Sequence, residues 1–392
     1  MSWTHRVGGF PALIVARSVL VGGLVAIVFA LCRHRGADAR TSALATLASF
    51  LLAWSHLAMR PQLLGALFFA VTLALTLTRE AGQRRMWLVL VVTFVWVNSH
   101  GSFVLAPVIV GVALVADLRS RRGHGWRLLP VLGATVAATL LNPWGPRVWV
   151  YVWSLSMNDT IRTTVTEWAP TSFSTASGAM FLVALIGIIV WFGLRRESVP
   201  AGALALVGAC SLFALMASRN VLWWALVVPP MLSGLVPEAG VSRSVRGGST
   251  ALNRALLGVL AVAVLVAMPW WRPSAHLVSG LPSNDVLAAV DRAVPNQTRL
   301  FVYQPWASWF EFSRPDLEPF VDSRIELFDR SLWDEYDLVI DGSDGWRETL
   351  ARHGIDAVLV SARETTLISQ LRGDPAWRSI VSDGSAALFV RV

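Results

Sequence analysis

Residues 86–118, MWLVLVVTFVWVNSHGSFVLAPVIVGVALVADL, decide how the chain would cross a membrane. A helix of that length would be about 50 Å long, which exceeds the roughly 30 Å hydrocarbon core of a bilayer. Arginines stand on both sides of the run, in residues 79–85 and 119–127. Because cytoplasmic loops are enriched in arginine, the chain must cross and return between them, through an outer turn at residues 98–101.

The same reasoning divides the first 271 residues into ten apolar spans. A break falls at Arg60-Pro61, because proline disfavours helix in the residue before it. The predicted spans are residues 10–32, 42–59, 61–78, 86–98, 101–118, 127–142, 177–194, 199–217, 220–236 and 252–271.

Five basic loops fall on the same side of these spans. Each follows an odd-numbered span: residues 33–40, 79–85, 119–127, 195–196 and 243–254. They are expected in the cytoplasm, which leaves the amino terminus and everything after residue 271 outside it. The sequence therefore predicts a multi-pass protein of the inner or plasma membrane.

Composition supports a membrane protein and argues against a nucleic-acid-binding protein. The chain is 55% hydrophobic and only 15% charged, whereas soluble domains average about 25% charged residues. Residues 1–271 carry a net charge of +14 and residues 272–392 carry −6. The positive excess lies in the predicted cytoplasmic loops, where it orients helices and meets anionic lipid, so nucleic-acid binding is not expected.

After residue 271 the composition becomes that of a soluble domain. Strand-like runs occur at residues 300–303, 320–321, 357–360, 379–381 and 387–390, and helical patterns at 283–293, 329–338, 344–353 and 364–372. Alternating strands and helices favour a small α/β domain. The predicted fold is thus an all-α polytopic membrane bundle, residues 1–271, followed by a soluble extracytoplasmic α/β domain, residues 272–392.

The connection at residues 143–176 is the one long outer loop of the membrane half. It carries Trp144, Trp149, Trp153, Trp168 and Tyr151, and such aromatic side chains prefer the membrane–water boundary. An amphipathic helix is expected there, over residues 146–157.

Polar and ionisable groups on the predicted outer side are the candidates for function. Arginine binds phosphate through a bidentate fork, so a lipid with a phosphate or diphosphate headgroup would suit such a cluster. The alternative is that these groups sit at helix ends and only orient the protein. The candidate substrate-binding residues are Arg60, Asn98, His100, Arg147, Glu167, Arg219 and Asn220, with Arg162 on the same side.

Other ionisable residues are interpreted more plainly. Arg17 and His56 lie inside spans and are expected to pair within the bundle or face a cavity. In the soluble domain, Asp322 follows a strand, and further acids crowd residues 329–341. A carboxylate at the strand end could bind a sugar or a metal, but a solvated acidic helix is the preferred interpretation of these acids. Glu167 could be a metal ligand or a base, but one acid without a partner is a weak signal for either. No metal site is predicted, and the sequence does not identify a cofactor.

Several stretches together resemble a bacterial branch of the GT-C superfamily of polytopic glycosyltransferases, in which a periplasmic α/β domain follows the helices. The stretches are WVNSHGSF (96–103), LNPWG (141–145), TEWAP (166–170), SRN (218–220), FVDSR (320–324) and RHGIDAVL (352–359). The resemblance implies transfer of a sugar from a polyprenyl-phosphate donor on the outer face.

The chain departs from this family at the catalytic acid. In the family that acid lies in the first outer loop, between the first two helices, whereas here no acid precedes Asp38, which is predicted to be cytoplasmic. Two explanations stay open. The chain lacks a leading helix and is inactive alone, which an outer amino terminus favours, or it binds lipid-linked sugar without transferring it.

Three functions are therefore carried forward. A glycosyltransferase-like protein comes first. A non-catalytic scaffold whose exported domain binds a partner comes second. A transporter comes third, because the sequence shows no internal repeat and few charges near the membrane midplane.

Overall fold

The computed structural model describes residues 2–119, 125–158, 161–162, 165–194, 199–236, 250–266 and 280–392. The chain divides into two compact units, Met1–Trp271 and Arg272–Val392. The predicted basic loops at residues 195–196 and 243–249, and Asp159, lie outside the described residues.

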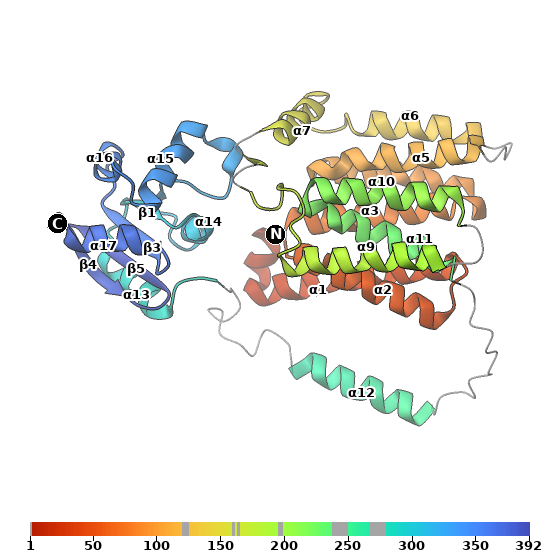
Figure 1. Cartoon of the computed structure of the whole chain (residues 1–392), viewed down its shortest axis with the longest axis horizontal. Coiled ribbons are helices and arrows are strands. Elements are labelled where there is room, and N and C mark those ends of the chain that lie inside the picture. The colour runs from red at the N-terminus through yellow and green to blue at the C-terminus, as the bar shows by residue number, and fades with distance from the viewer. Residues whose placement is uncertain are drawn as a thin grey trace. The chain divides into compact units, whose positions relative to one another are not determined.

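The first unit is helical (Figure 1). Its α-helices are α1 (Ser2–His34), α2 (Ala39–Ala53), α3 (Pro61–Leu77), α4 (Leu88–Val97), α5 (Leu105–Arg119), α6 (Leu128–Ala138), α7 (Arg147–Met157), α9 (Ala176–Leu194), α10 (Ala201–Met216), α11 (Val221–Ser233) and α12 (Thr250–Val266). Short 3₁₀ helices lie between them: η1 (Trp54–His56), η2 (Arg79–Ala81), η3 (Gln83–Trp87), η4 (Gly101–Val104), η5 (Gly125–Arg127) and η6 (Ser218–Asn220). Each of the ten predicted spans overlaps one of these α-helices, and α7 forms where the amphipathic helix was predicted.

Three helical segments among the described residues are long and apolar enough to cross a membrane. They are Thr4–His34, Gly101–Arg119 and Ala176–Leu194. Other apolar helices are shorter: α4 has 10 residues, or about 15 Å, which is half of the hydrocarbon core. The described helices are thus compatible with a membrane protein, and the ten crossings remain a prediction.

Helix α11 forms the centre of the bundle. It packs against α1, α2, α3 and α10, and it is buried on nearly all sides. The buried Trp224 donates a 3.0 Å hydrogen bond from its indole nitrogen to the Ser211 hydroxyl of α10. A helix that is apolar all round is expected at the centre of such a bundle.

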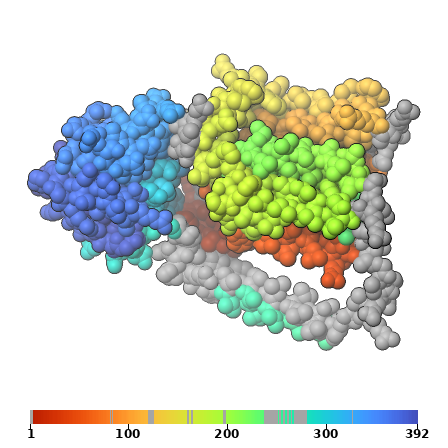
Figure 2. All heavy atoms as spheres, viewed as in Figure 1, coloured from red at the N-terminus to blue at the C-terminus, as the bar shows by residue number. Residues whose placement is uncertain are grey.

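The outer helices expose apolar side chains instead. Along α9, Val183, Ile189 and Leu194 are 70%, 60% and 77% exposed. Figure 2 shows α9 and α10, in yellow-green to green, as one continuous surface. An apolar surface of this extent is unusual on a soluble monomer and suits contact with lipid.

Two helix boundaries follow from local sequence. Helix α1 is broken at Gly8-Gly9, where Gly9 has φ +61°, a left-handed conformation that favours glycine. Arg60 is extended, with φ −125° and ψ 160°, and Pro61 begins α3. The predicted break at Arg60-Pro61 is therefore confirmed.

The second unit contains one five-stranded sheet with the order β2-β1-β3-β5-β4. The strands are β1 (Arg299–Val302), β2 (Glu318–Pro319), β3 (Ala357–Ser361), β4 (Trp377–Ser382) and β5 (Ala386–Arg391). Strand β1 pairs in parallel with β2 and β3, and β5 pairs antiparallel with β3 and β4. The helices are α13 (Asn284–Ala293), α14 (Gln304–Ser313), α15 (Arg330–Ile340), α16 (Trp346–Arg352) and α17 (Thr365–Gly373).

This mixed sheet with helices confirms the predicted α/β class of the second unit. Two local features differ from prediction. Strand β2 ends at Pro319, so the predicted strand at residues 320–321 falls just beyond it. Helix α14 was not predicted.

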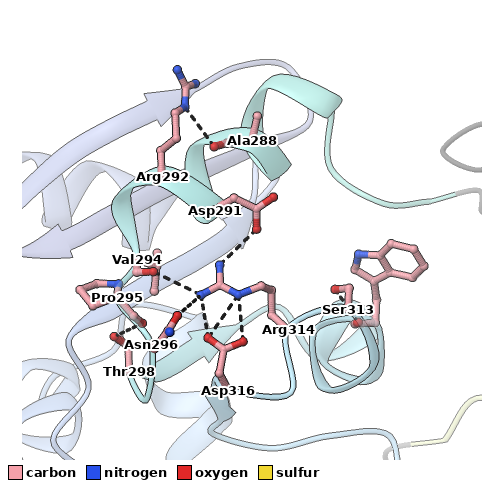
Figure 3. A network of polar contacts seen from close by, with 11 residues as sticks. Ala288, Asp291, Arg292, Val294, Pro295, Asn296, Thr298, Ser313, Arg314 and Asp316 are labelled. Carbon is pink, nitrogen blue, oxygen red and sulfur yellow. Dashed lines mark hydrogen bonds and ion pairs between the residues drawn. The ribbon is translucent and has the colours of Figure 1, made fainter.

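Arg314 joins the end of α13 to the loop after α14 (Figure 3). Its guanidinium donates to the Asp316 carboxylate at 2.7 Å and to Asp291 at 3.1 Å, and it also reaches the Asn296 side chain. The hydrogen bond from Arg314 lowers the pKa of Asp316. These contacts fix the entry to β1, where the core of the second unit begins.

Asp322 is not part of a solvated surface, so that reading was wrong. It is only 3% exposed, and its carboxylate accepts hydrogen bonds from the backbone N–H of Arg324 at 2.6 Å and from the Arg324 Nε at 2.9 Å. A buried carboxylate needs such a partner. The Asp322 carboxylate therefore holds its own loop in place, and the Arg324 guanidinium balances its negative charge.

Candidate functional site

The junction between α2 and α3, residues 54–62, organises the candidate site. It runs through η1 and an extended Arg60 before Pro61 starts α3. Arg17 of α1 donates a 2.7 Å hydrogen bond from its Nε to the carbonyl of Leu57. Arg17 thus pairs within the bundle, as expected, and places a cation at this junction.

Arg60 reaches across to the long loop and pairs with Glu167. Its Nη1 lies 2.6 Å from Glu167 Oε1, and the two side chains are 61% and 33% exposed. The main chain around Glu167 is fixed as well, because its carbonyl accepts a 3.0 Å hydrogen bond from the backbone N–H of Arg219. Arg60, Glu167 and Arg219 are therefore brought together by tertiary structure.

Residues 165–171 and 214–219 lie side by side. Ala169 accepts from the backbone N–H of Ser218 at 3.0 Å, and Thr171 donates from its hydroxyl to the Ala214 carbonyl at 2.6 Å. This pairing carries Arg219 to the Trp168 ring, where its Cζ lies 4.2 Å from the ring centroid. A guanidinium stacked on indole keeps its edge available for an anion.

His100 belongs to a small polar network in the turn between α4 and η4. The backbone N–H of Ser102 donates to His100 Nδ1 at 3.1 Å, and the Ser102 hydroxyl forms a 2.7 Å hydrogen bond with the same nitrogen. Trp96 donates from its indole nitrogen to the Ser102 hydroxyl. Since a backbone N–H donates to Nδ1, a neutral ring carries its proton on Nε2.

Gly65 of α3 allows this network to form. A Cβ at this position would lie 2.7 Å from Ser102 Oγ and 3.1 Å from His100 Nδ1. Helix α3 therefore contributes to the site at two places: Arg60 at its start and Gly65 one turn later. We define the cluster as Arg17, His56, Arg60, His100, Glu167, Trp168 and Arg219.

Two predicted site residues have other tasks in the structure, and a third stands apart from the cluster. The Asn98 amide donates to the carbonyls of Phe94 and Leu141, at 2.8 and 2.9 Å, and the buried Asn220 donates to the Phe213 carbonyl at 2.9 Å. Arg147 is exposed in the first turn of α7, and within the described part of the chain it forms no ion pair with the cluster. Asn98 and Asn220 hold the main chain in place.

Two residues beside Arg60 were not singled out as site residues. His56 is 8% exposed and Gln62 is 7% exposed. Among the described residues, neither ring nitrogen of His56 nor the amide nitrogen of Gln62 has a hydrogen-bond partner. The charges that act on the His56 ring are those of Glu167, Arg219 and Arg60. For His56 the one signal in the sequence was an ionisable residue inside a predicted span, and for Gln62 the only signal was its proximity to the Arg60-Pro61 break.

An apolar cavity of about 700 Å³ lies toward the other end of α3. Phe69 and Leu73 of α3, Val108 and Val112 of α5, and Trp223 of α11 line it. Because Arg60 starts α3, this cavity does not form part of the cluster.

Metal binding finds no support in the described residues, where no group of three or more His, Cys, Asp or Glu side chains is placed to hold an ion. No protein-family model matches the sequence, and no curated protein matches it.

Proposed function

We propose that the first unit binds a polyprenyl-phosphate-linked sugar on the outer face of the cell membrane, as a glycosyltransferase-like protein. The observation that carries this proposal is that Arg60 and Arg219 both act on one carboxylate, Glu167, at the start of α3, while Arg17 bonds to the main chain of the same junction at Leu57. The net positive charge suits a phosphate, and Trp168 beside Arg219 suits a site at the membrane–water boundary.

The proposal includes the membrane topology. Ten crossings place the arginine-rich loops in the cytoplasm, and the cluster together with the second unit on the exported side. The short α4 and the turn at residues 98–101 then lie within the outer leaflet, close to the headgroups.

One observation favours binding over transfer. Glu167 is the only carboxylate of the cluster among the described residues, and it is already paired with Arg60. A base or nucleophile of a transferase needs a carboxylate that is free to meet the reacting group. We therefore propose a binding role as the second candidate beside a transferase role. In that role the protein would act as a scaffold that presents lipid-linked sugar.

Equilibrium binding in lipid nanodiscs tests the proposal. The probe is undecaprenyl phosphate, added to the full chain and to its Arg219→Ala and Arg60→Ala variants. Each variant should bind at least about tenfold more weakly, because each loses a charge-assisted hydrogen bond. Arg40→Ala, at the opposite end of α2 from His56, is the matched control and should bind like the parent. Equal binding by all four proteins would refute the proposal.

A further inference from the structure

The start of α3 holds buried polar groups that no described residue satisfies. His56 Nδ1, His56 Nε2 and Gln62 Nε2 are inaccessible to solvent and unpaired. Buried polar side chains nearly always have a hydrogen-bond partner, so unpaired ones point to a group that is absent. Gln62 Nε2 can only donate, and a neutral histidine offers one donor. The absent group must therefore accept hydrogen bonds.

The main chain at the same place also favours an acceptor. Helix α3 has 17 residues, Gln62 lies in its first turn, and no side chain caps its start at Arg60. The start of a helix carries a partial positive charge, although here Pro61 has no N–H and the Leu63 N–H already donates to the Arg60 carbonyl at 2.9 Å. Such a terminus is suited to a phosphate.

Charge around the junction completes the argument. Arg17 bonds to Leu57, next to His56, and Arg60 immediately precedes α3. Glu167, Arg219 and Arg60 act on the His56 ring. The described residues thus set two guanidinium groups, those of Arg60 and Arg219, against one carboxylate, and that carboxylate bonds to Arg60.

We propose that His56 and Gln62 donate hydrogen bonds to a phosphate group bound at the N-terminus of α3 beside Arg60, and that the Glu167 carboxylate occupies this position on Arg60 when phosphate is absent. The inference rests on the proposed function and assigns the residues that contact the phosphate. Binding exchanges one anion for another: Arg60 releases Glu167 and takes the phosphate, whose oxygens then reach the two buried donors. Arg60 is 61% exposed, so its side chain has room to move.

The test uses the full chain in nanodiscs with two probes, inorganic phosphate and undecaprenyl phosphate. Gln62→Leu and His56→Leu remove the donors while keeping an apolar side chain in place. Each should weaken binding about tenfold or more, the usual effect of losing a hydrogen bond to a charged group. His56→Gln keeps a donor and should stay within about threefold of the parent.

Thr72→Val is the matched control. Thr72 is buried and unpaired like Gln62, but it lies ten residues further along α3, about 15 Å away. This variant should bind both probes like the parent. The thermal unfolding midpoint of all four variants should stay at or above that of the parent, because removing an unpaired polar group removes no contact.

The outcomes separate the inference from the proposed function. If the two leucine variants bind both probes more weakly than the parent, the inference and the proposed function are both supported. If the parent binds inorganic phosphate but not undecaprenyl phosphate, and the leucine variants weaken that binding, the inference is supported and the lipid-linked function is overturned. If the parent binds undecaprenyl phosphate and the leucine variants bind it equally well, the inference is wrong and the function stands. A parent that binds neither probe overturns both. Loss of binding that only follows a lowered unfolding midpoint overturns the inference alone.

Discussion

Arg60 and Glu167 lie 107 residues apart in the chain, yet a 2.6 Å hydrogen bond joins their side chains. This contact ties the start of α3 to the long loop between α7 and α9. It also pairs Glu167, the single acid of the cluster, with the Arg60 cation, to which a phosphate would otherwise bind.

Glu167→Gln should therefore tighten binding of undecaprenyl phosphate. The substitution removes a negative charge that competes for Arg60, which is worth about 1 kcal/mol, or about fivefold, for charges a few ångströms apart in a water-like medium. The pair is largely exposed, so the variant should change the free energy of unfolding by less than about 1 kcal/mol. Equilibrium binding in nanodiscs gives the affinity. Weaker binding would instead place Glu167 in direct contact with the ligand.

Trp168→Leu should weaken the same binding. Arg219 lies over the Trp168 ring, and losing a cation–π contact of this kind costs about 0.5–2 kcal/mol. The affinity should fall about twofold to thirtyfold. Trp153→Leu is the control, since Trp153 is 67% exposed on α7. Equal losses in both variants would indicate a general aromatic effect at the membrane boundary.

Gly65→Ala should destabilise the first unit by about 1–3 kcal/mol, because its Cβ would press on Ser102 and His100. Gly133→Ala is a matched substitution inside α6, where a Cβ meets nothing within 4 Å, and it should be neutral or stabilising. Thermal unfolding of both variants in detergent compares them. A stable Gly65→Ala protein would show that the network at His100 is loosely packed.

The second unit should lose stability in acid through Asp383. Its carboxylate accepts from the Ser283 hydroxyl at 2.5 Å and from the backbone N–H groups of Ser385 and Ala386, at 2.7 and 3.0 Å. These hydrogen bonds, first among them the one from Ser283, lower the pKa of Asp383. A carboxyl group with a lowered pKa stabilises the fold above its unfolded pKa of about 4, and this contribution is lost as the pH falls below that value.

Asp383→Ala makes this prediction specific. At pH 7 the variant should lose about 1–2 kcal/mol, because Ser283, which caps α13, loses its partner. Pulse-labelling hydrogen exchange in urea, measured on peptides from residues 280–392, gives the free energy of unfolding. The difference between parent and variant should shrink between pH 4 and pH 2. A constant difference would mean that the charge of Asp383 contributes nothing.

The helices could be placed from the sequence because hydropathy and the Arg60-Pro61 break are local signals. Helix α14 could not, since Trp306, Trp309, Phe310 and Phe312 give no clear polar face in the sequence. Strand β2 was displaced because a two-residue strand leaves almost no pattern. Its position depends on pairing with β1.

For the cluster, the sequence predicted only the side of the membrane on which its residues lie. Placing the arginine-rich loops in the cytoplasm puts Arg60, Glu167 and Arg219 on the other side, but hydropathy does not show which of them touch. The Arg60–Glu167 pair, the Arg219–Trp168 stack and the unpaired Gln62 all depend on tertiary packing. Asn98 and Asn220 looked like candidates because polar groups at membrane depth are costly, and the structure uses both to satisfy carbonyl groups.

Site-specific labelling of single cysteines tests the central claim most directly, namely that the cluster and the second unit share the exported side. In a background with Cys32→Ala and Cys210→Ala, cysteine replaces the exposed Ser174, Ser343 or Arg40 in turn. A membrane-impermeant maleimide added to intact spheroplasts should label positions 174 and 343, and should label position 40 only after lysis. Labelling of position 40 in intact spheroplasts, with 174 and 343 protected, would contradict the account.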